Sequence, residues 1–358
     1  MLKFTNNYSR NLTFNFRIDL SEKFHEYYVR FFGIFEIVFG IFVKRKNIKV
    51  RAKIQNAFSG KIEAIGFPIL ALCWVSFFWG TTWLASKEAV RHMPGLQVAT
   101  IRQFLGGLLY VGYFLIKKEP WPKGKQWKTI IILSILNFAL SNGLSTWGVK
   151  YISSGLGAII SALFPIWIII INFFNGKKIA RVALFGILIS FGGICIIFMD
   201  YLSDFLKPDF QFGIILMTAS TITWAFGILE TKKKAASFNP YFSLGLQMLI
   251  SSVFLFGITE VSGTNIPLSE ISMNSWWAII YLIIIGSVLT FIAFIYTLQH
   301  LPTEISSIYV YINPIVAMVL GSFIFGETLT QAIAIGAAVT LVGLYLVNKS
   351  IRKTKNLI

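Results

Sequence analysis

Long apolar stretches separated by short polar segments run along the chain from residue 65 onward. A helix that crosses the hydrocarbon core of a bilayer needs about 20 mostly apolar residues, and ten stretches are long enough. They are residues 65–86, 95–116, 127–147, 152–174, 180–199, 211–229, 241–259, 276–298, 304–325 and 331–348. The pattern therefore predicts an all-α integral membrane protein with ten transmembrane helices.

The composition agrees with this prediction. Only 13% of the 358 residues are charged, whereas an average soluble domain has about 25%. The 34 Phe and 10 Trp residues exclude a disordered chain. Cys73 and Cys195 both lie in apolar stretches, so they indicate neither a disulfide framework nor a metal site, and we expect no cofactor. The segments between the predicted helices are too short for a folded domain, so function must reside within the helical bundle or at its faces.

The net charge of +17 has a one-sided distribution. If successive loops lie on opposite sides of the membrane, 27 of the 32 Lys and Arg residues fall on the side of the two termini and four on the other side. Cytoplasmic loops carry the excess of Lys and Arg. We therefore expect a multi-pass protein of the cell (inner or plasma) membrane with both termini in the cytoplasm. The basic charge reflects topology, and we do not expect nucleic acid as a partner.

Residues 1–63 form a basic N-terminal extension, and residues 350–358 form a basic cytoplasmic tail. The extension contains one apolar stretch, 31–43, which is too short to span the bilayer comfortably and includes Glu36. One interpretation is a segment on the inner leaflet whose basic residues contact anionic membrane lipids. The other is an extension without a function.

The ten predicted helices divide into two similar halves, 64–200 and 211–349. Equivalent residues recur at a shift of 145 to 150 positions: Trp79 and Trp224, Lys87 and Lys232, Pro165 and Pro314, Gly186 and Gly336, Gly193 and Gly343. Because each half has five helices, the second half must be inverted relative to the first. Inverted repeats are typical of transporters, in which two half-structures move about a central site. The paired glycines predict close helix contacts.

Three stretches resemble EamA-type permeases of the drug/metabolite transporter superfamily. The first, residues 79–107, has the family's Trp-Gly pair, Lys, Pro and Arg as Trp79, Gly80, Lys87, Pro94 and Arg102. Residues 149–170 are similar to the fourth helix of the family, and residues 301–347 to its last two helices, including the pair Gly326–Glu327. The first half has Gly176–Lys177 at the equivalent place, so no role of the family's first-half Glu is carried over.

The resemblance implies ten helices in two EamA repeats and passage of small metabolites, often amino acids, through a central cavity. It covers residues 64–349 and implies a permease, not an enzyme. Members of the family differ widely in substrate, so the resemblance indicates the class of protein and not its substrate.

Arg102 is the one basic residue well inside a predicted span, and ionisable groups there are costly. It could hold a carboxylate or phosphate of the substrate, or it could bind backbone carbonyls of a bent helix. Gln247 lies in the corresponding helix of the second half. Other candidates for substrate binding are Trp79, Trp167 and Trp224, the polar pair Asn137 and Ser141, and the group of Tyr309 and Asn313.

Each candidate has a structural alternative. The tryptophans could pack helices, and the polar residues could join helices by hydrogen bonds. Pro165 and Pro314 each remove a backbone hydrogen bond and are predicted to kink their helices. Lys87, at a helix end, is expected to reach the membrane surface as an anchor.

The leading hypothesis is a transporter of small polar metabolites, most plausibly an exporter of amino acids, that works by alternating access. A carrier of phosphorylated or nucleotide-linked metabolites is an alternative within the same fold, and a non-transporting membrane scaffold is an alternative of another class. No carboxylate lies in the middle of a predicted span, and no Walker-type loop is present. The sequence leaves open whether the chain forms a homodimer.

Overall fold

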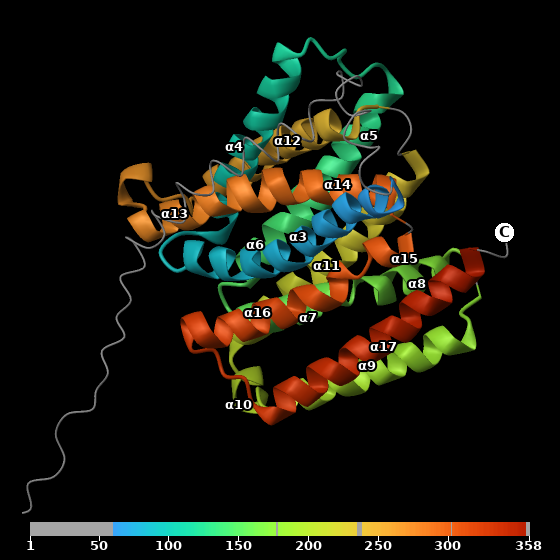
Figure 1. Ribbon diagram of the computed structural model, residues 1–358. Helices are drawn as coiled ribbons and strands as arrows, with labels where there is room; N and C mark the ends of the chain where they lie inside the picture. Colours follow the sequence, from blue (N-terminus) through green and yellow to red (C-terminus); the bar gives the residue numbers. More distant parts are fainter. Residues whose placement is uncertain (1–59, 177, 235–237, 302, 356–358) are drawn as a thin grey trace, which may run out of the picture. The chain divides into compact units, whose positions relative to one another are not determined.

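The computed structural model describes residues 60–176, 178–234, 238–301 and 303–355. The chain divides into the units Met1–Ala64 and Ile65–Ile358. The expected membrane-surface segment at 31–43 lies outside the described residues. Every regular element among the described residues is a helix (Figure 1).

The first half contains five membrane-crossing helices, two of which are built from shorter pieces. Its elements are α3 (Gly60–Ala89), α4 (Gly95–Ile116), α5 (Lys125–Leu133), the π-helix η1 (Ser134–Asn142), α6 (Gly143–Gly148), α7 (Ser154–Ala162), α8 (Phe164–Phe174) and α9 (Arg181–Met199). A short helix, α10 (Leu202–Phe205), lies in the connection to the second half.

The second half repeats this order. Its elements are α11 (Pro208–Lys234), α12 (Pro240–Val261), the 3-10 helix η2 (Leu268–Glu270), α13 (Met273–Tyr281), the π-helix η3 (Leu282–Leu289), α14 (Thr290–His300), α15 (Thr303–Ser306), α16 (Tyr309–Phe325) and α17 (Gln331–Lys355). Within the described residues, nine helices are long and apolar enough to cross a membrane, and α16, with 17 residues, is slightly shorter. The predicted all-α membrane fold is confirmed.

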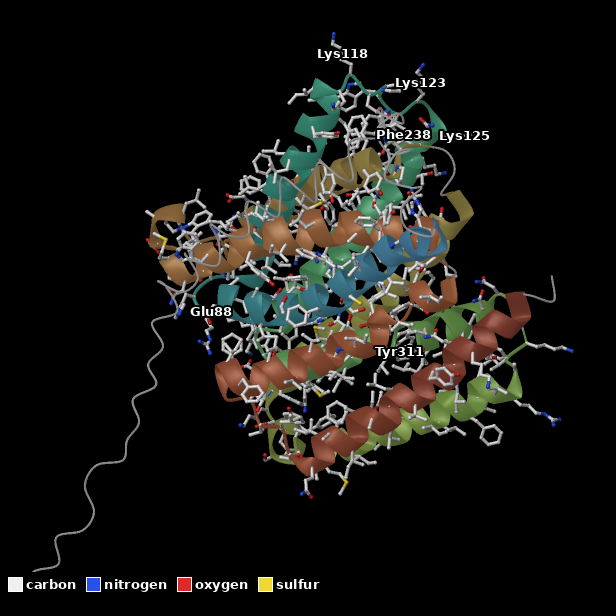
Figure 2. The ribbon with its side chains drawn as sticks, in the orientation of Figure 1. Glu88, Lys118, Lys123, Lys125, Phe238 and Tyr311 are labelled. Atoms are coloured by element: carbon white, nitrogen blue, oxygen red, sulfur yellow. The ribbon has the colours of Figure 1, made fainter. Side chains whose placement is uncertain are left out.

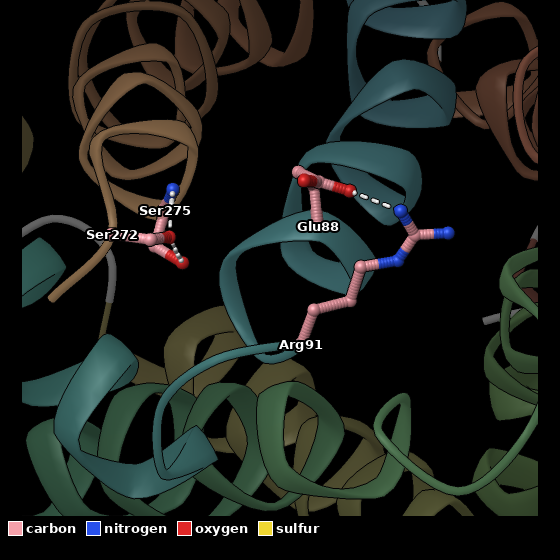
Figure 3. A network of polar contacts seen from close by, with 4 residues as sticks. All are labelled: Glu88, Arg91, Ser272 and Ser275. Carbon is pink, nitrogen blue, oxygen red and sulfur yellow. Dashed lines mark hydrogen bonds and ion pairs between the residues drawn. The ribbon is translucent and has the colours of Figure 1, made fainter.

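Local capping residues define where several helices begin. Ser153 accepts a hydrogen bond from the Leu156 amide at the start of α7 (3.2 Å). Asn239 accepts hydrogen bonds from two amides of the first turn of α12, directly before Pro240. Ser272 caps α13 through the Ser275 amide (3.2 Å; Figure 3). Such caps satisfy amides that have no partner within the helix.

The fifth and tenth crossing helices, α9 and α17, run side by side with their small residues in contact (Figure 1). A Cβ atom on Gly186 would lie 2.7 Å from the Gly343 carbonyl oxygen, so both backbones meet without side chains between them. Ser190 donates a hydrogen bond to the Thr340 carbonyl (3.2 Å) across the same interface. The close contact predicted from the paired glycines is confirmed.

The third helix of each half contains a π-helical segment in its middle. The α-helical periodicity expected over 127–147 is therefore interrupted at η1, and η3 interrupts the equivalent helix of the second half. A π-helix bonds each carbonyl to the amide five residues further on, which widens the turn and is frequent at functional sites. The wider turn of η1 brings Asn142 onto the face of Asn137 and Ser141.

The two repeat-related prolines have different effects on the backbone. Pro165 lies in the first turn of α8, directly after a break at Leu163. Pro314 lies inside α16, which continues on both sides of it. The helix predicted over 304–325 is broken earlier, between α15 and α16. Only Pro165 therefore coincides with an interruption of its helix.

Candidate functional site

A cavity of about 140 Å³ lies between the two halves of the bundle. The first half contributes side chains from α3, α4, η1, α6, α7 and α8, and the second from α11, α14 and α16. Its lining residues are Trp79, Thr82, Trp83, Ser86, Arg102, Asn137, Phe138, Ser141, Asn142, Ser145, Thr146, Ala158, Ser161, Ala162, Phe164, Ser220, Trp224, Phe291, Tyr309, Val310, Asn313 and Pro314. The wall is thus polar on some sides and aromatic on others, and these lining residues of the described chain include no Asp or Glu.

The structure brings most of the predicted site residues to this one cavity. The candidates that line it are Trp79, Arg102, Asn137, Ser141, Trp224, Tyr309, Asn313 and Pro314. Three others lie elsewhere. Gln247 donates a hydrogen bond to Ser243 on its own helix (2.9 Å). Trp167 is half-buried on α8, beyond the last cavity residue of that segment, Phe164. Pro165 is buried next to Phe164 without lining the cavity.

Several lining residues were not among the predicted site residues. Trp83 follows Trp79 by one helical turn and shares its face, a spacing that could have identified it. Asn142 reaches the cavity because of the π-helix, for which the sequence carries no simple signal. Ser161 and Ser220 are two of many hydroxyl residues within the spans, and nothing in their spacing distinguishes them.

Arg102 is the basic residue of the cavity wall, and its side chain joins the two halves. It is 5% exposed, and its Nε donates a hydrogen bond to Ser287 Oγ on η3 (2.8 Å). A Cβ atom on Gly286 would lie 3.1 Å from Arg102 Nη2, so the guanidinium packs directly on the π-helical backbone. Among the described residues the ion pairs are Arg91–Glu88 and Lys207–Asp204. The positive charge of Arg102 therefore has no carboxylate partner in that part of the chain.

An aromatic cluster joins the two halves at one end of the cavity. The Trp79 ring lies 5.2 Å from the Phe291 ring, 4.8 Å from Phe294 and 5.1 Å from Tyr309, measured between centroids. Trp79 belongs to the first half and the other three to the second. These edge-on and tilted contacts are favourable arrangements for aromatic rings. They close the space beside the cavity between α3, α14 and α16.

Polar contacts within the first half lie where α3 leaves the cavity. Lys87, one residue beyond the lining residue Ser86, donates hydrogen bonds to the carbonyls of Val149 (2.9 Å), Lys150 (3.1 Å) and Ile152 (2.7 Å). The expectation of a simple surface anchor is therefore wrong for Lys87. The reason is that its ammonium finds unpaired carbonyls between α6 and α7, which sequence spacing does not reveal.

Glu327 makes a second contact at this end. It accepts hydrogen bonds from the Ser154 amide (2.7 Å), the Ser154 hydroxyl (2.9 Å) and the Gly155 amide (3.3 Å). A carboxylate from the second half thus caps α7 of the first half, where the helix dipole favours negative charge. Gly321 permits this approach, because a Cβ atom there would lie 2.5 Å from Glu327 Oε2.

The end of α3 is also linked to α16. Arg91 pairs with Glu88 one turn earlier (3.0 Å; Figure 3), and its guanidinium lies 4.7 Å from the ring centroid of Phe325. Hydrogen bonds, a helix cap and this cation–π contact therefore gather at one end of the cavity, and aromatic rings at the other.

Within the described residues, nine apolar helices long enough to cross a membrane and the shorter α16 form two similar halves with a polar cavity between them. This arrangement defines a multi-pass membrane transporter. A model of the EamA-like transporter family matches the chain twice, over residues 66–199 and 211–349. The chain belongs to the EamA-like transporter family and carries two copies of its repeat, as the sequence resemblance predicted.

Relatives of known sequence agree with this assignment. The chain is 25% identical over 282 residues to the uncharacterized inner membrane transporter YedA of Escherichia coli strain K12, covering 78% of this chain and 90% of that protein. It is 25% identical over 289 residues to the uncharacterized transporter YvbV of Bacillus subtilis, covering 80% and 93%. It is 27% identical over 282 residues to the chloroplastic WAT1-related protein At3g02690 of Arabidopsis thaliana, covering 76% and 67%.

A solved crystal structure with 15% sequence identity has a TM-score of 0.54 to this fold and covers 80% of this chain and 97% of its own. At that identity the likeness concerns the fold alone.

Proposed function

We propose that the protein moves small polar metabolites across the membrane by alternating access to the cavity between its two repeats. The single observation that carries this proposal is the cavity itself, which is walled by both halves and contains a buried arginine without a carboxylate partner among the described residues. Amino acids are the first substrates to test, and export the first direction, because the EamA resemblance implies both. The substrate-binding residues we propose are the seven predicted binding candidates that line the cavity, and Pro314 beside them stays a candidate for a helix kink.

The contacts at the two ends of the cavity suggest how access alternates. Trp79 links the halves through aromatic rings, and Glu327 links them through the cap on α7. The stretch of α3 from Trp79 to Ser86 runs along the cavity for about 10 Å, at 1.5 Å per residue. Separation of the halves at one end while the other stays joined opens the cavity to one side at a time. This movement is the behaviour expected of inverted repeats.

A carrier of phosphorylated compounds is less well supported. Phosphate groups carry more negative charge than a carboxylate, and carriers of such compounds favour several basic groups. Arg102 is the one Lys or Arg among the lining residues.

We propose that the protein lies in the inner or plasma membrane with both termini in the cytoplasm. The support is the excess of Lys and Arg on one side and the name of the YedA relative. Figure 2 shows Lys118, Lys123 and Lys125 gathered about the loop between α4 and α5, well apart from Glu88 at the end of α3. The loop between α4 and α5 belongs to the proposed cytoplasmic side.

Flux through purified protein in proteoliposomes tests the transport proposal. Vesicles are loaded with a mixed panel of radiolabelled amino acids and organic acids, and efflux is compared with that from protein-free vesicles. We expect protein-dependent efflux of at least one carboxylate-bearing compound. Absence of flux for the whole panel, from protein shown to be folded by its thermal transition, would contradict the proposal.

A further inference from the structure

Three asparagines of the cavity wall have their side-chain carbonyl oxygens engaged or turned away from the cavity. Asn313 Oδ1 accepts a hydrogen bond from Trp83 Nε1 (3.1 Å). An indole nitrogen can only donate, so the oxygen of Asn313 must face Trp83. The amide NH₂ of Asn313 is then the part of the side chain left for the cavity.

The other two asparagines lie on the π-helix η1. Asn142 Oδ1 accepts a hydrogen bond from Gln103 Nε2 (3.3 Å), whose own carbonyl oxygen accepts from Ser251. Asn137 Oδ1 is buried against Gly227, so closely that a Cβ atom at Gly227 would overlap it. Both side chains line the cavity. Because their oxygens are engaged or buried, the NH₂ groups are the parts of these side chains available to a substrate.

Arg102 adds the remaining donors. Its Nε is engaged with Ser287, while the two terminal nitrogens have no carboxylate partner among the described residues. The acceptors that the wall offers are neutral hydroxyl oxygens. Thr82 and Ser220, for example, donate their protons to backbone carbonyls (2.7 and 2.8 Å) and leave only lone pairs free. Among the described residues, the wall therefore has a positive charge, amide donors, neutral acceptors and no negative charge.

From this arrangement we infer that the substrate is an organic acid that binds as an anion, with a carboxylate at Arg102 and no ammonium group. The inference rests on the proposed transport function. It keeps the carboxylate of the proposed substrates and replaces amino acids, as the expected substrate, with acids that lack the ammonium group. A carboxylate has only acceptor sites and forms strong hydrogen bonds to charged donors. An ammonium enclosed in this cavity would lose its hydration and meet no carboxylate in exchange. Tryptophan faces attract cations more weakly than a carboxylate does.

The cavity also limits the size and shape of the acid. A water molecule, which has one non-hydrogen atom, needs a cavity of roughly 10–15 Å³. The cavity of about 140 Å³ therefore holds a molecule of on the order of ten non-hydrogen atoms. Rings of Trp79, Trp83, Trp224 and Phe291 form much of the wall. A flat, apolar body attached to the carboxylate fits this lining.

Pairs of compounds that differ only in the α-ammonium test the inference. The pairs are 3-phenylpropionate with L-phenylalanine, and 4-methylpentanoate with L-leucine. Binding to the full-length purified protein is measured by calorimetry, and uptake is measured in proteoliposomes. We expect each acid to bind at least about tenfold more tightly than its amino acid, which is the order of effect of one charge-assisted contact.

Three variants connect this preference to the cavity wall. Arg102→Gln is expected to weaken acid binding by about 10- to 100-fold. Arg181→Gln, the same change at an exposed residue at the start of α9, is the matched control and should leave binding unchanged. Asn313→Asp keeps the acceptor for Trp83 and places a carboxylate oxygen toward the cavity. It should weaken acid binding and raise the relative affinity for the amino acid, which keeps the inference testable if Arg102→Gln does not fold.

The outcomes separate this inference from the proposed function. The inference is supported if the protein prefers the acids, if Arg102→Gln or Asn313→Asp reduces this preference, and if Arg181→Gln leaves it unchanged. Equal or tighter binding of the amino acids overturns it and leaves transport intact. Absence of binding and flux for all four compounds, together with no flux for the wider panel, overturns both.

Discussion

Removing the negative charge of Glu327 while keeping its shape should loosen the contact between the two repeats. In Glu327→Gln the side chain retains one carbonyl oxygen, which can satisfy the Ser154 amide (2.7 Å), but it brings an NH₂ group to the Ser154 hydroxyl and the Gly155 amide. Hydrogen bonds to charged groups are worth about 1.5–3 kcal/mol, against about 0.5–1.5 kcal/mol for neutral ones. The interaction with the helix dipole adds about 0.3–1 kcal/mol.

The expected loss is about 2 kcal/mol, since Glu327 is half-buried and solvent screens part of the effect. A loss of 1 kcal/mol lowers the melting temperature of a large domain by roughly 2–4 °C, so the transition in detergent should fall by about 4–8 °C. Tryptophan fluorescence during heating measures the melting temperature. Glu270→Gln, at an exposed position on η2, is the matched control and should change the melting temperature little.

A double-mutant cycle with Ser154→Ala locates the effect. Ser154→Ala removes only the hydroxyl contact with Glu327, so the two substitutions should be coupled by about 1 kcal/mol. The reasoning is refuted if Glu327→Gln melts at the temperature of Glu270→Gln, or if the two effects at Glu327 and Ser154 simply add.

Three further predictions concern other contacts. Gly193→Ala should destabilise the protein by about 1–3 kcal/mol because its Cβ atom would collide with α17. The control Gly192→Ala has open space around it and should be neutral or slightly stabilising in the same melting experiment. Trp79→Ala should cost about 2–3 kcal/mol through loss of three ring contacts, and Trp79→Phe should recover part of the melting temperature. In a bacterial host, alkaline phosphatase fused within the loop 200–210 should be active, and green fluorescent protein fused at the C-terminus should fluoresce. The reverse pattern would contradict the proposed orientation.

The sequence was sufficient to predict the membrane-crossing helices and their division into repeats. In a bilayer every backbone group must be bonded within the segment, so apolar length alone identifies a spanning helix. Paired glycines likewise predicted the contact between α9 and α17, because only residues without side chains allow backbones to approach so closely. Arg102 was identifiable for a related reason, since a charge within an apolar span is costly and is usually retained for a purpose.

Features that depend on how helices face one another could not be predicted. Gln247 and Trp167 are as polar or aromatic as the residues that line the cavity. Gln247, however, bonds Ser243 on its own helix, and Trp167 lies beyond Phe164, the last cavity residue of α8. The π-helices change the face that Asn142 presents, and their hydrogen-bond pattern leaves no periodicity in the sequence. The partners of Lys87 and Glu327 lie 62 or more positions away along the chain, so spacing carries no information about them.

The central claim is that substrate passes through the cavity between the repeats. Labelling of Ser161→Cys by a maleimide in proteoliposomes tests it most directly, in a protein whose exposed Cys73 and Cys195 have been changed to alanine. We predict that a transported acid such as 3-phenylpropionate slows labelling at Ser161→Cys and leaves labelling unchanged at the exposed control Asn274→Cys. A labelling rate at Ser161→Cys that does not respond to a compound the protein transports would contradict the claim.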